Sequence, residues 1–559
     1  MFKLPTFWYV LVFVLMADVV SAQGQLFCVP PDGLANQSGV VSALYFDSVP
    51  QDQPDCGMRV VNGRITFDAK VTNPSMTCPD RFAWKMFVEA ISNNFWTNWA
   101  SDNSTFPGCN GGSVACDGSS PEKRPGAPLP LCGPGGDPAA CCNPDSRTNP
   151  GYNNNWNPAI SCPNFPGDHP GVKAPHIAQA PSKAHALAAP VPATAGLANA
   201  FDKGRVIRQA AAEIVFRNRA QWDYTFRNNL YNQEGLAKVF ANANANLAGN
   251  LPYRNLDTPG NLFEIRFPVD AVSIKSNWIS RQFALEQKVD DDPPHIKMTV
   301  RSPVNLNSIN DFNGVTLQPG EYWLMAMHIT SKDIPDWTWA TFEHVDNPGR
   351  CDFIGCNDSF GYQAADKNIL ATQYRNYTAP FIKSDNLCVA SWVFDRGRIY
   401  PSGPASSGLA AILNALQIGT GRSSVPPTAA DPGWRSYRLK GSLNSFSDKM
   451  GHPRRVGNSV TEGGFVSTSG CMTCHSRASI GPKGSIPPPV SIFTNTLSEV
   501  GYSQALMGTP NPNWFLSENQ PPQYNAFPAD FVWGILSARC VNPSFNPIAC
   551  FLTPPKPAR

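Results

Sequence analysis

The chain has 559 residues, of which 15% are charged, and its 44 basic residues nearly balance its 42 acidic ones. Charges of both signs are interspersed, so the composition leaves no footprint for nucleic acid or for an anionic membrane surface. The 54 prolines and 43 glycines favour a loop-rich, mostly β protein over a helical bundle, and the length allows about three domains.

The first residues have the features of a secretory signal peptide. Lys3 precedes the short apolar run FWYVLVFVLMADVV, and the VSA that ends at Ala22 suits signal peptidase. The run is too short for a lasting membrane helix, and no later stretch approaches the roughly 20 apolar residues that a span needs. We therefore expect residues 1–22 to be cleaved and the mature protein to be periplasmic or secreted, without a membrane span.

Residues 23–165 hold nine of the sixteen cysteines, and this cysteine content fits an oxidising compartment. We expect the region to consist of loops stapled by disulfides. Its one predicted helix spans residues 81–100, where apolar residues recur every four positions and so share one face. These residues are Phe87, Ile91, Phe95 and Trp99. The Pro- and Ala-rich stretch 166–200 then forms a linker.

Residues 201–425 are expected to form a helical stretch followed by a β-rich domain. Over 202–246, two apolar stripes predict helix, with Asp202 as the N-cap. The stripes are Val206, Ala210 and Ile214, and then Trp222, Phe226 and Leu230. Alternating segments, and one apolar run that starts from a Pro-Gly turn at 319–320, predict strands, and regular turns between them indicate a β-sandwich. The segments are 261–280, 295–300, 319–331 and 333–348, and a short helix follows over 405–419.

Residues 430–559 form the last expected domain. It contains the cluster STSGCMTCHSRASIGP and later the stretch DFVWGILSARC, which predicts a helix capped by Asp530. The predicted fold class of the whole chain is therefore multidomain α+β, with a loop-rich, β-sandwich-like portion and a small, mostly α C-terminal domain.

Cys471, Cys474 and His475 match C-x-x-C-H, the attachment signature of c-type haem. Two thiols three residues apart lie on one helical turn and can add to the two vinyl groups on one edge of the porphyrin. The next residue then directs its imidazole to the iron as an axial ligand. In a chain of this composition the pattern is expected by chance roughly 0.007 times. The motif predicts one covalently attached haem c.

Three other interpretations of the motif compete with haem. Structural zinc needs two further Cys or His ligands at matching spacing, and the sequence has no second C-x-x-C and no H-x₃₋₅-H. A thioredoxin-like redox pair belongs to a βαβ unit, whereas VTEGGFVSTSG precedes this motif. A simple disulfide explains neither the spacing nor the histidine. The remaining cysteines are even in number and can all pair, with Cys351–Cys356 and Cys540–Cys550 as local candidates.

Together with the signal peptide, the motif resembles the c-type cytochromes over residues 434–540. The resemblance implies a cytochrome c-like haem domain with a methionine as the distal iron ligand, and Met507 in YSQALMGTPNP is the only methionine after the motif. It also implies that DFVWGILSAR is the C-terminal helix. Two alternatives stay open: Met507 packs beside Leu506 without touching the iron, or His452 in DKMGHPRR is the sixth ligand.

A second group of ligand-type side chains lies in the β-rich region, namely His328, Glu343, His344 and Asp346. Two histidines and a carboxylate can hold a metal with open positions. Alternating residues of a strand point to opposite faces, so we favour polar strand ends that hydrogen-bond the next loop, and we expect no second metal. The segment WTWATFEHVDNP resembles part of large bacterial cytochrome-like proteins, a likeness that implies no activity.

The sequence thus predicts an exported monohaem c-type cytochrome that transfers single electrons through its iron. Its expected partner is a redox protein or a small-molecule electron donor or acceptor. No catalytic residue is assigned. Two alternatives remain: a haem-dependent oxidoreductase or peroxidase with an open distal site, and a non-haem secreted binding protein.

Overall fold

The architecture comes from a computed structural model of the whole chain. The described residues are 52–107, 128–146, 149, 162–168, 211–248, 256–287, 289–300, 304–305, 316–347, 350, 356–361, 376–377, 381–384, 387–390, 405–448, 451, 453–463, 469–484, 508–516 and 526–541. The signal peptide predicted for residues 1–22 and the linker predicted from residue 169 to residue 200 lie outside them.

Helices are mostly short, and no helix among the described residues is long and apolar enough to cross a membrane. They are α3 (Pro74–Thr77), α4 (Pro79–Ser92), α5 (Phe95–Asn98), α6 (Asp102–Thr105), η1 (Pro166–Asp168), α8 (Arg219–Arg227), α9 (Gln233–Ala248), α10 (Arg281–Glu286), α12 (Ser407–Ala415), η3 (Pro432–Ser436), α13 (Cys471–His475), η6 (Pro512–Trp514) and η7 (Trp533–Ser537).

Strands supply the framework. They are β1 (Met58–Val61), β2 (Arg64–Phe67), β3 (Ala100–Ser101), β4 (Ala212–Arg217), β5 (Val272–Ser280), β6 (Lys297–Val300), β7 (Val304–Asn305), β8 (Thr316–Leu317), β9 (Gly320–Ser331), β10 (Thr338–His344), β11 (Cys356–Asn357), β12 (Asn376–Tyr377), β13 (Phe381–Ser384), β14 (Leu387–Ala390), β15 (Tyr437–Leu443), β16 (Ser479–Ile480) and β17 (Phe527–Pro528).

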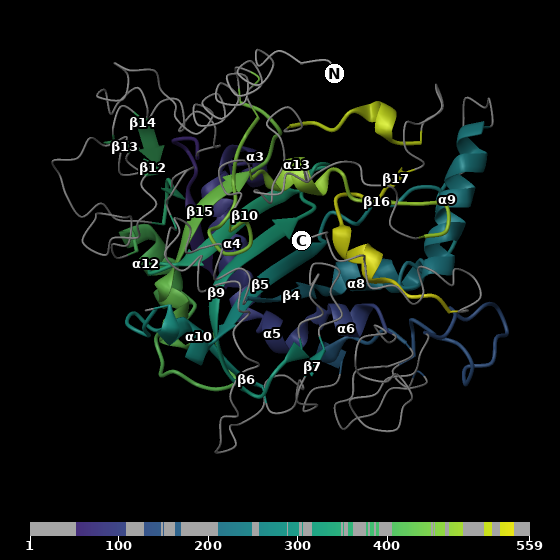
Figure 1. Cartoon of the computed structure of the whole chain (residues 1–559), viewed down its shortest axis with the longest axis horizontal. Helices are drawn as coiled ribbons and strands as arrows, with labels where there is room; N and C mark the ends of the chain where they lie inside the picture. The colour runs from purple at the N-terminus through teal and green to yellow at the C-terminus, as the bar shows by residue number, and fades with distance from the viewer. Residues whose placement is uncertain are drawn as a thin grey trace, which may run out of the picture.

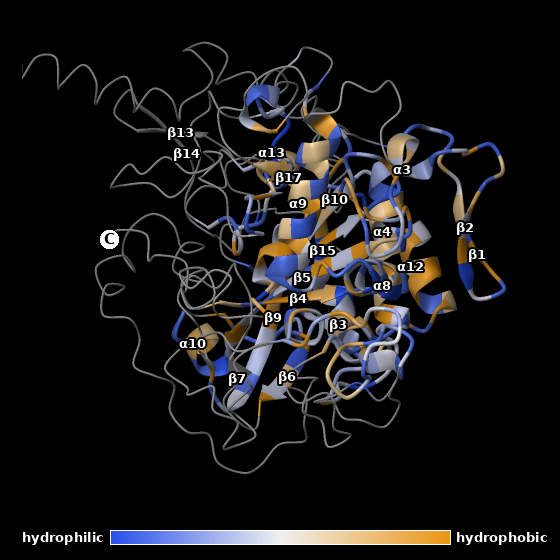
Figure 2. Ribbon diagram, turned by 90° about the vertical axis from the view of Figure 1, so that its right-hand side faces the viewer, coloured by the Kyte–Doolittle hydropathy of each residue, from blue (hydrophilic) through white to orange (hydrophobic). Residues whose placement is uncertain are grey.

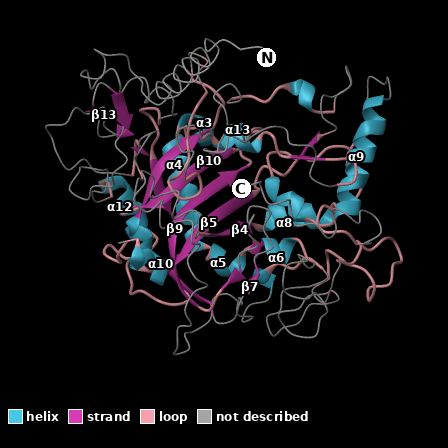
Figure 3. Cartoon of the chain, in the orientation of Figure 1, coloured by secondary structure: helices cyan, strands magenta, loops and turns pink. Residues whose placement is uncertain are grey.

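One seven-stranded sheet lies at the centre of the molecule (Figures 1 and 3). Its strands follow the order β15-β10-β9-β5-β4-β3, all neighbours are antiparallel, and β6 pairs with β9 beside this path. In the central strands, Thr341 lies opposite His328, and His328 lies opposite Lys275. Because β3 and β15 come from regions far apart in the sequence, the sheet joins the Cys-rich and the C-terminal parts of the chain.

One face of this sheet is apolar and packs against helices. Ile329 of β9 and Phe342 of β10 share a buried cluster with Phe87 of α4 and Leu413 of α12. The rings of Phe87 and Phe342 are 4.6 Å apart between centroids. Figure 2 shows the hydrophobic residues of α12 in orange. Burial of apolar surface, worth about 25 cal/mol per Å², makes this layer a main source of stability.

The opposite face of the sheet carries polar and charged side chains. Along β10, Trp339, Thr341 and Glu343 alternate onto this face, since successive side chains of a strand point to opposite sides. The segment 456–463 covers it with hydrogen bonds: Asn458 Nδ2 donates to Thr341 Oγ1 at 3.1 Å, and the backbone N–H of Ser459 donates to Glu343 at 2.9 Å. The face is therefore an interior polar layer on which the C-terminal segment rests.

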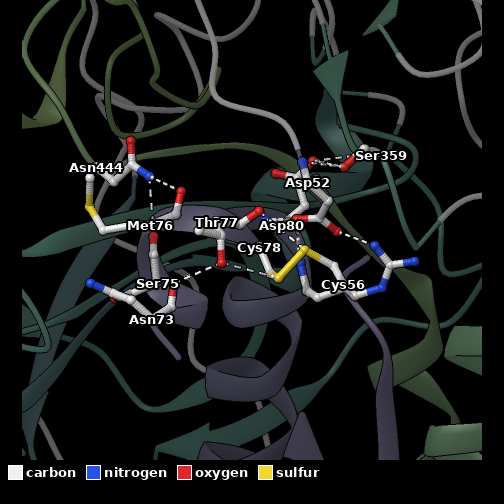
Figure 4. Close-up of a disulfide and its surroundings, with 11 residues drawn as sticks. Asp52, Cys56, Asn73, Ser75, Met76, Thr77, Cys78, Asp80, Ser359 and Asn444 are labelled. Carbon is white, nitrogen blue, oxygen red and sulfur yellow. Dashed lines mark hydrogen bonds and ion pairs between the residues drawn. A yellow bond between two sulfur atoms is a disulfide. The ribbon is translucent and has the colours of Figure 1, made fainter. Parts of the chain in front are cut away.

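Two predictions about the N-terminal part are confirmed. The expected helix is present as α4 followed by α5, with Phe87, Ile91 and Phe95 fully buried, and Asn94 interrupts it with a left-handed φ of 47°. Disulfides staple the surrounding loops, and the one between Cys56 and Cys78 closes the entry to α4 (Figure 4). The others described there are Cys132–Cys141 and Cys142–Cys162.

The helix predicted over 202–246 is wrong over residues 212–217. Residues 212–217 form β4, in which Ala212, Ile214 and Phe216 alternate into the apolar core and pair with β5. These three residues recur every two positions, but Ile214 also continues the four-residue spacing of Val206 and Ala210, so the sequence fits a helix as well as a strand. The second stripe is confirmed as core, because Trp222 and Phe226 on α8 are buried. Asp202, the expected N-cap, lies outside the described residues.

The expected β-sandwich and the mostly α C-terminal domain also differ from the structure. Over the described part of the chain, the layer packed on the apolar face is helical, and β15 of the C-terminal region belongs to the central sheet. The stretch DFVWGILSARC contains only the short 3-10 helix η7. Asp530 and Phe531 have φ values of 47° and 67°, so Asp530 forms a turn and not a helix cap.

Candidate functional site

The C-x-x-C-H motif forms the single-turn helix α13, whose backbone N–H of Cys474 donates to the carbonyl of Gly470 at 2.9 Å. Met472 and Thr473 are buried in this turn, whereas Cys471, Cys474 and His475 are partly exposed. Cys471 packs against the buried cluster that contains Met472, so the three chemical groups of the motif lie at the edge of the core.

Contacts from distant segments hold α13 in place. The indole Nε1 of Trp533 donates to the carbonyl of Cys474 at 3.1 Å. The hydroxyl of Thr473 accepts a hydrogen bond from the backbone N–H of Gly508 at 2.8 Å. The guanidinium of Arg477 donates to the backbone carbonyl of Thr473. The motif is thus fixed by tertiary contacts and does not depend on the helix propensity of one turn.

His475 has one ring nitrogen held and one ring nitrogen left over. Its Nδ1 lies 2.8 Å from the backbone carbonyl oxygen of Phe531, which can only accept, so Nδ1 carries the proton. In this tautomer Nε2 has no proton and can bind a metal. Metal-binding histidines adopt the same arrangement, in which the other ring nitrogen donates to an acceptor that orients the ring. Burial lowers the pKa of His475 to about 3, so the ring is neutral.

The carbonyl of Phe531 is aimed by the turn at Asp530. The Asp530 carboxylate lies 2.5 Å from Lys332 Nζ and accepts from the backbone N–H of Phe267 at 2.7 Å. It also lies 3.4 Å from Trp337 Nε1. Left-handed backbone at two non-glycine residues persists where the surroundings fix it, and these contacts do so. Asp530 therefore positions the Phe531 carbonyl that contacts His475. The sequence analysis expected it to be a helix cap and did not predict this role.

The two motif thiols differ from the other described cysteines. Cys471 and Cys474 are free, whereas all other cysteines among the described residues are in disulfides, including Cys356 and Cys540. The partners of these last two lie outside the described residues, so the local pairs predicted for them stay predictions. Burial raises the pKa of Cys471 well above its usual value and that of Cys474 to about 11.

Ionisable side chains of the polar sheet face lie close to the motif. His328 Nε2 is 3.2 Å from Glu462 Oε1, and Lys275 Nζ is 3.1 Å from Glu213 Oε2. Glu462 raises the pKa of Cys471 through its charge, and Lys275 lowers that of His475. Burial, the largest single influence, raises the pKa of Glu462, but His328, the backbone N–H of Asn458 and Lys275 together outweigh it, so the pKa is lowered. Glu462 is therefore a carboxylate.

The second group of ligand-type residues is not brought together. Among the described residues no cluster of three or more His, Cys, Asp or Glu side chains could hold a metal ion. Glu343 accepts from Ser459 and lies 3.4 Å from Lys440 Nζ, which is the strand-to-loop bonding that we favoured. His344 points to the other face and stacks on His295, with ring centroids 3.5 Å apart.

Met507 and His452, the two residues that the sequence analysis offered as a distal ligand, lie outside the described residues. Their immediate neighbours are described. Gly508 donates to Thr473 of the motif, and a Cβ added at Gly508 would lie 3.7 Å from Pro453 Cγ. Gly508, which follows Met507, therefore contacts the motif helix, and Pro453, which follows His452, lies next to Gly508.

Sequence reasoning missed most of the groups that surround the motif. Trp339, whose ring lies 4.3 Å from that of His475, was predicted only as one residue of an alternating strand. Phe531 contributes through its carbonyl, which has no sequence signal. Glu462 and Lys275 are single charges in unremarkable segments, and only the fold brings them to the motif.

The chain matches no protein-family model, no curated protein and no solved structure. What the site does must therefore follow from the chemistry of its own residues.

Proposed function

We propose that the protein is an exported monohaem c-type cytochrome whose haem is attached at Cys471 and Cys474 and ligated by His475. One observation carries the proposal. Two free thiols stand three residues apart on one turn, beside a neutral histidine whose Nδ1 is held by a carbonyl and whose Nε2 is available. This combination fits covalent haem better than a disulfide, a zinc site or a redox dithiol.

Each residue has a defined task in this proposal. Cys471 and Cys474 would hold the haem through thioether bonds, each S–H adding across one vinyl group with its hydrogen on the other vinyl carbon, so that no oxidant would be needed. His475 offers Nε2 to the metal, with Phe531 and Trp339 fixing the ring. When bound, the haem supplies one-electron chemistry between Fe(III) and Fe(II).

The remaining expectations from the sequence belong to the same proposal. Residues 430–559 would carry the haem, resting on the central sheet through β15. Met507 is the distal ligand that the resemblance to cytochromes implies, and a redox protein or a small electron donor or acceptor is the partner. A protein of this kind is periplasmic or secreted, because its disulfides and its haem are formed outside the cytoplasm.

A second candidate function has one observation in its favour. His328, Glu462 and Lys275 lie beside the motif, and ionisable groups next to an open iron position suit proton-coupled chemistry on a peroxide or an organic substrate. A haem-dependent oxidoreductase is therefore the alternative to a carrier.

The test is a haem-stained denaturing gel of protein matured in a host that attaches haem c. The wild type should stain, and the variant Cys471→Ala/Cys474→Ala should not. The matched control is Cys132→Ala/Cys141→Ala, which removes two cysteines of a described disulfide but neither motif cysteine and should keep the stain. An unstained wild-type band at normal yield would refute both haem functions and leave the non-haem secreted binding protein.

A further inference from the structure

The sheet places a second histidine on the face where His475 rests. Trp339, which contacts the His475 ring, lies opposite Thr330 of β9, and His328 is two residues before Thr330 on the same face. Diagonal neighbours of this kind on adjacent strands are about 7–8 Å apart.

The hydrogen bonds of His328 leave one ring nitrogen free. Its Nε2 lies 3.2 Å from the ionised Glu462, so Nε2 carries the proton and donates it. Its Nδ1 is buried and has no hydrogen-bond partner within the described part of the chain. A buried nitrogen without a hydrogen-bond partner lowers the stability of the folded protein, unless a bound water, metal or cofactor interacts with it.

Asn458 also lies beside His328 Nε2. Its Oδ1 accepts from the backbone N–H groups of Val460 and Thr461, which fixes the orientation of the amide. Its Nδ2 donates to Thr341 Oγ1 at 3.1 Å and also lies 3.2 Å from His328 Nε2. The proton on His328 Nε2 follows from Glu462, whose carboxylate oxygen lies 3.2 Å away and can only accept.

His328 and His475 therefore share one arrangement. Each has one ring N–H held by an oxygen, Glu462 in one case and the Phe531 carbonyl in the other, and each has one nitrogen left without a proton. Histidines that bind metal are oriented in this way, by a carboxylate or a backbone carbonyl on the nitrogen that does not bind.

We propose that His328 is the second axial ligand of the haem iron, which makes the site bis-histidine. This inference rests on the proposed function, since it requires haem at the motif. It differs from the cytochrome expectation of Met507, because it takes the ligand from a sheet strand that precedes the motif by more than 140 residues. A rigid central strand also holds a ligand more precisely than a loop does.

In this arrangement the Glu462 carboxylate would lower the reduction potential of the iron. A carboxylate on the N–H of a ligating imidazole makes that ligand more basic and favours the ferric state. Glu462→Gln keeps a hydrogen-bond acceptor but removes the charge, so this variant should keep its low-spin haem and gain a more positive reduction potential.

The deciding experiment compares the absorption and electron paramagnetic resonance spectra of haem-loaded wild type, His328→Ala and Met507→Ala. His328→Ala should change from low-spin to high-spin ferric haem, and added imidazole should restore the low-spin state. Met507→Ala should stay low-spin. Thr330→Ala is the matched control, because it truncates the same face of β9 two residues away.

Three outcomes would overturn the inference: a low-spin His328→Ala protein, a high-spin Met507→Ala protein, or a high-spin wild type. If His328→Ala does not fold by circular dichroism, the Glu462→Gln protein decides, and an unchanged potential contradicts the assignment. A wild type without covalent haem is a different result, because it refutes the proposed function itself.

Discussion

The imidazole of His475 lies against the indole of Trp339, with ring centroids 4.3 Å apart and ring planes inclined by 44°. One residue belongs to the motif helix and the other to the second strand of the central sheet. The sheet thus provides the surface against which the His475 ring packs, so the motif and the sheet form one structural unit.

Trp339→Ala should destabilise the protein and loosen His475. Trp339 is 4% exposed, and removal of a buried tryptophan side chain costs about 3–5 kcal/mol. Urea unfolding monitored by circular dichroism measures this loss. Haem attachment should persist, because both thiols remain in this variant, while the haem spectrum broadens. Trp339→Phe keeps an aromatic wall and should lose less than half as much stability; equal losses would contradict a packing role.

The motif thiols should react with an alkylating reagent in protein produced without haem attachment. After denaturation under non-reducing conditions, peptide mapping should find label on Cys471 and Cys474 and none on Cys56, Cys78 or the other described disulfide cysteines. In native protein the labelling should be slow near neutral pH, because burial raises the pKa of both thiols and leaves little thiolate. Labelled disulfide cysteines, or protected motif thiols in the denatured protein, would count against the assignment.

Lys440 should be worth more than an ordinary surface lysine. Its side chain is 1% exposed and lies 3.4 Å from the fully buried Glu343, which also receives hydrogen bonds from the segment over the polar face. Lys440→Met leaves a buried carboxylate uncompensated and should cost about 3–5 kcal/mol in the free energy of unfolding.

Two further variants separate this charge effect from general damage. Glu343→Gln/Lys440→Met removes both charges and should recover part of the loss. Lys85→Met breaks a pair with Glu89 that is partly exposed, and it should cost less than about 1 kcal/mol. If the two lysine variants lose equal stability, the buried pair does not have the importance that its geometry indicates.

The buried carboxyl of Asp358 should make stability fall as the pH rises from about 4 to 6. Burial raises its pKa to about 6, against lowering by the backbone N–H groups of Gly361 and Phe360. Between the unfolded and folded pKa values the native state holds the proton more tightly, so folding is favoured at the low end and this contribution is lost above the folded pKa.

Asp358→Asn isolates that contribution. Because one pKa unit corresponds to about 1.4 kcal/mol, the wild type should lose on the order of 2 kcal/mol relative to this variant between pH 4.5 and pH 7. Urea unfolding at a series of pH values provides the comparison. A constant difference between the two proteins across that range would show that Asp358 does not titrate in the way its burial requires.

The limits of sequence reasoning follow from which interactions are local. Helix α4 and the strand β9 were predictable, because their apolar spacing lies within one segment. The run 202–246 was not, because β4 has apolar residues that fit both a spacing of two and a helical stripe, and only pairing with β5 decides. The C-x-x-C-H motif could be recognised from the sequence alone. The side chains that surround it could not, because they come from distant segments that only the fold brings together.

The distal side of the site shows the same limit. Met507 and His452 were selected because they are near the motif in the sequence. His328 was noticed only as one member of a candidate metal group, since nothing in the sequence states that β9 and the motif share a face of one sheet. The hydrogen bond that leaves its other nitrogen free comes from Glu462, on a third segment.

Mass spectrometry of the peptide that contains residues 471–475 tests the central claim most directly. The protein is matured in a host that attaches haem c and is then digested without reduction. We predict one haem on this peptide, bound through both Cys471 and Cys474. A folded, exported protein whose peptide carries no haem, or whose two motif cysteines are joined to each other, would contradict the assignment.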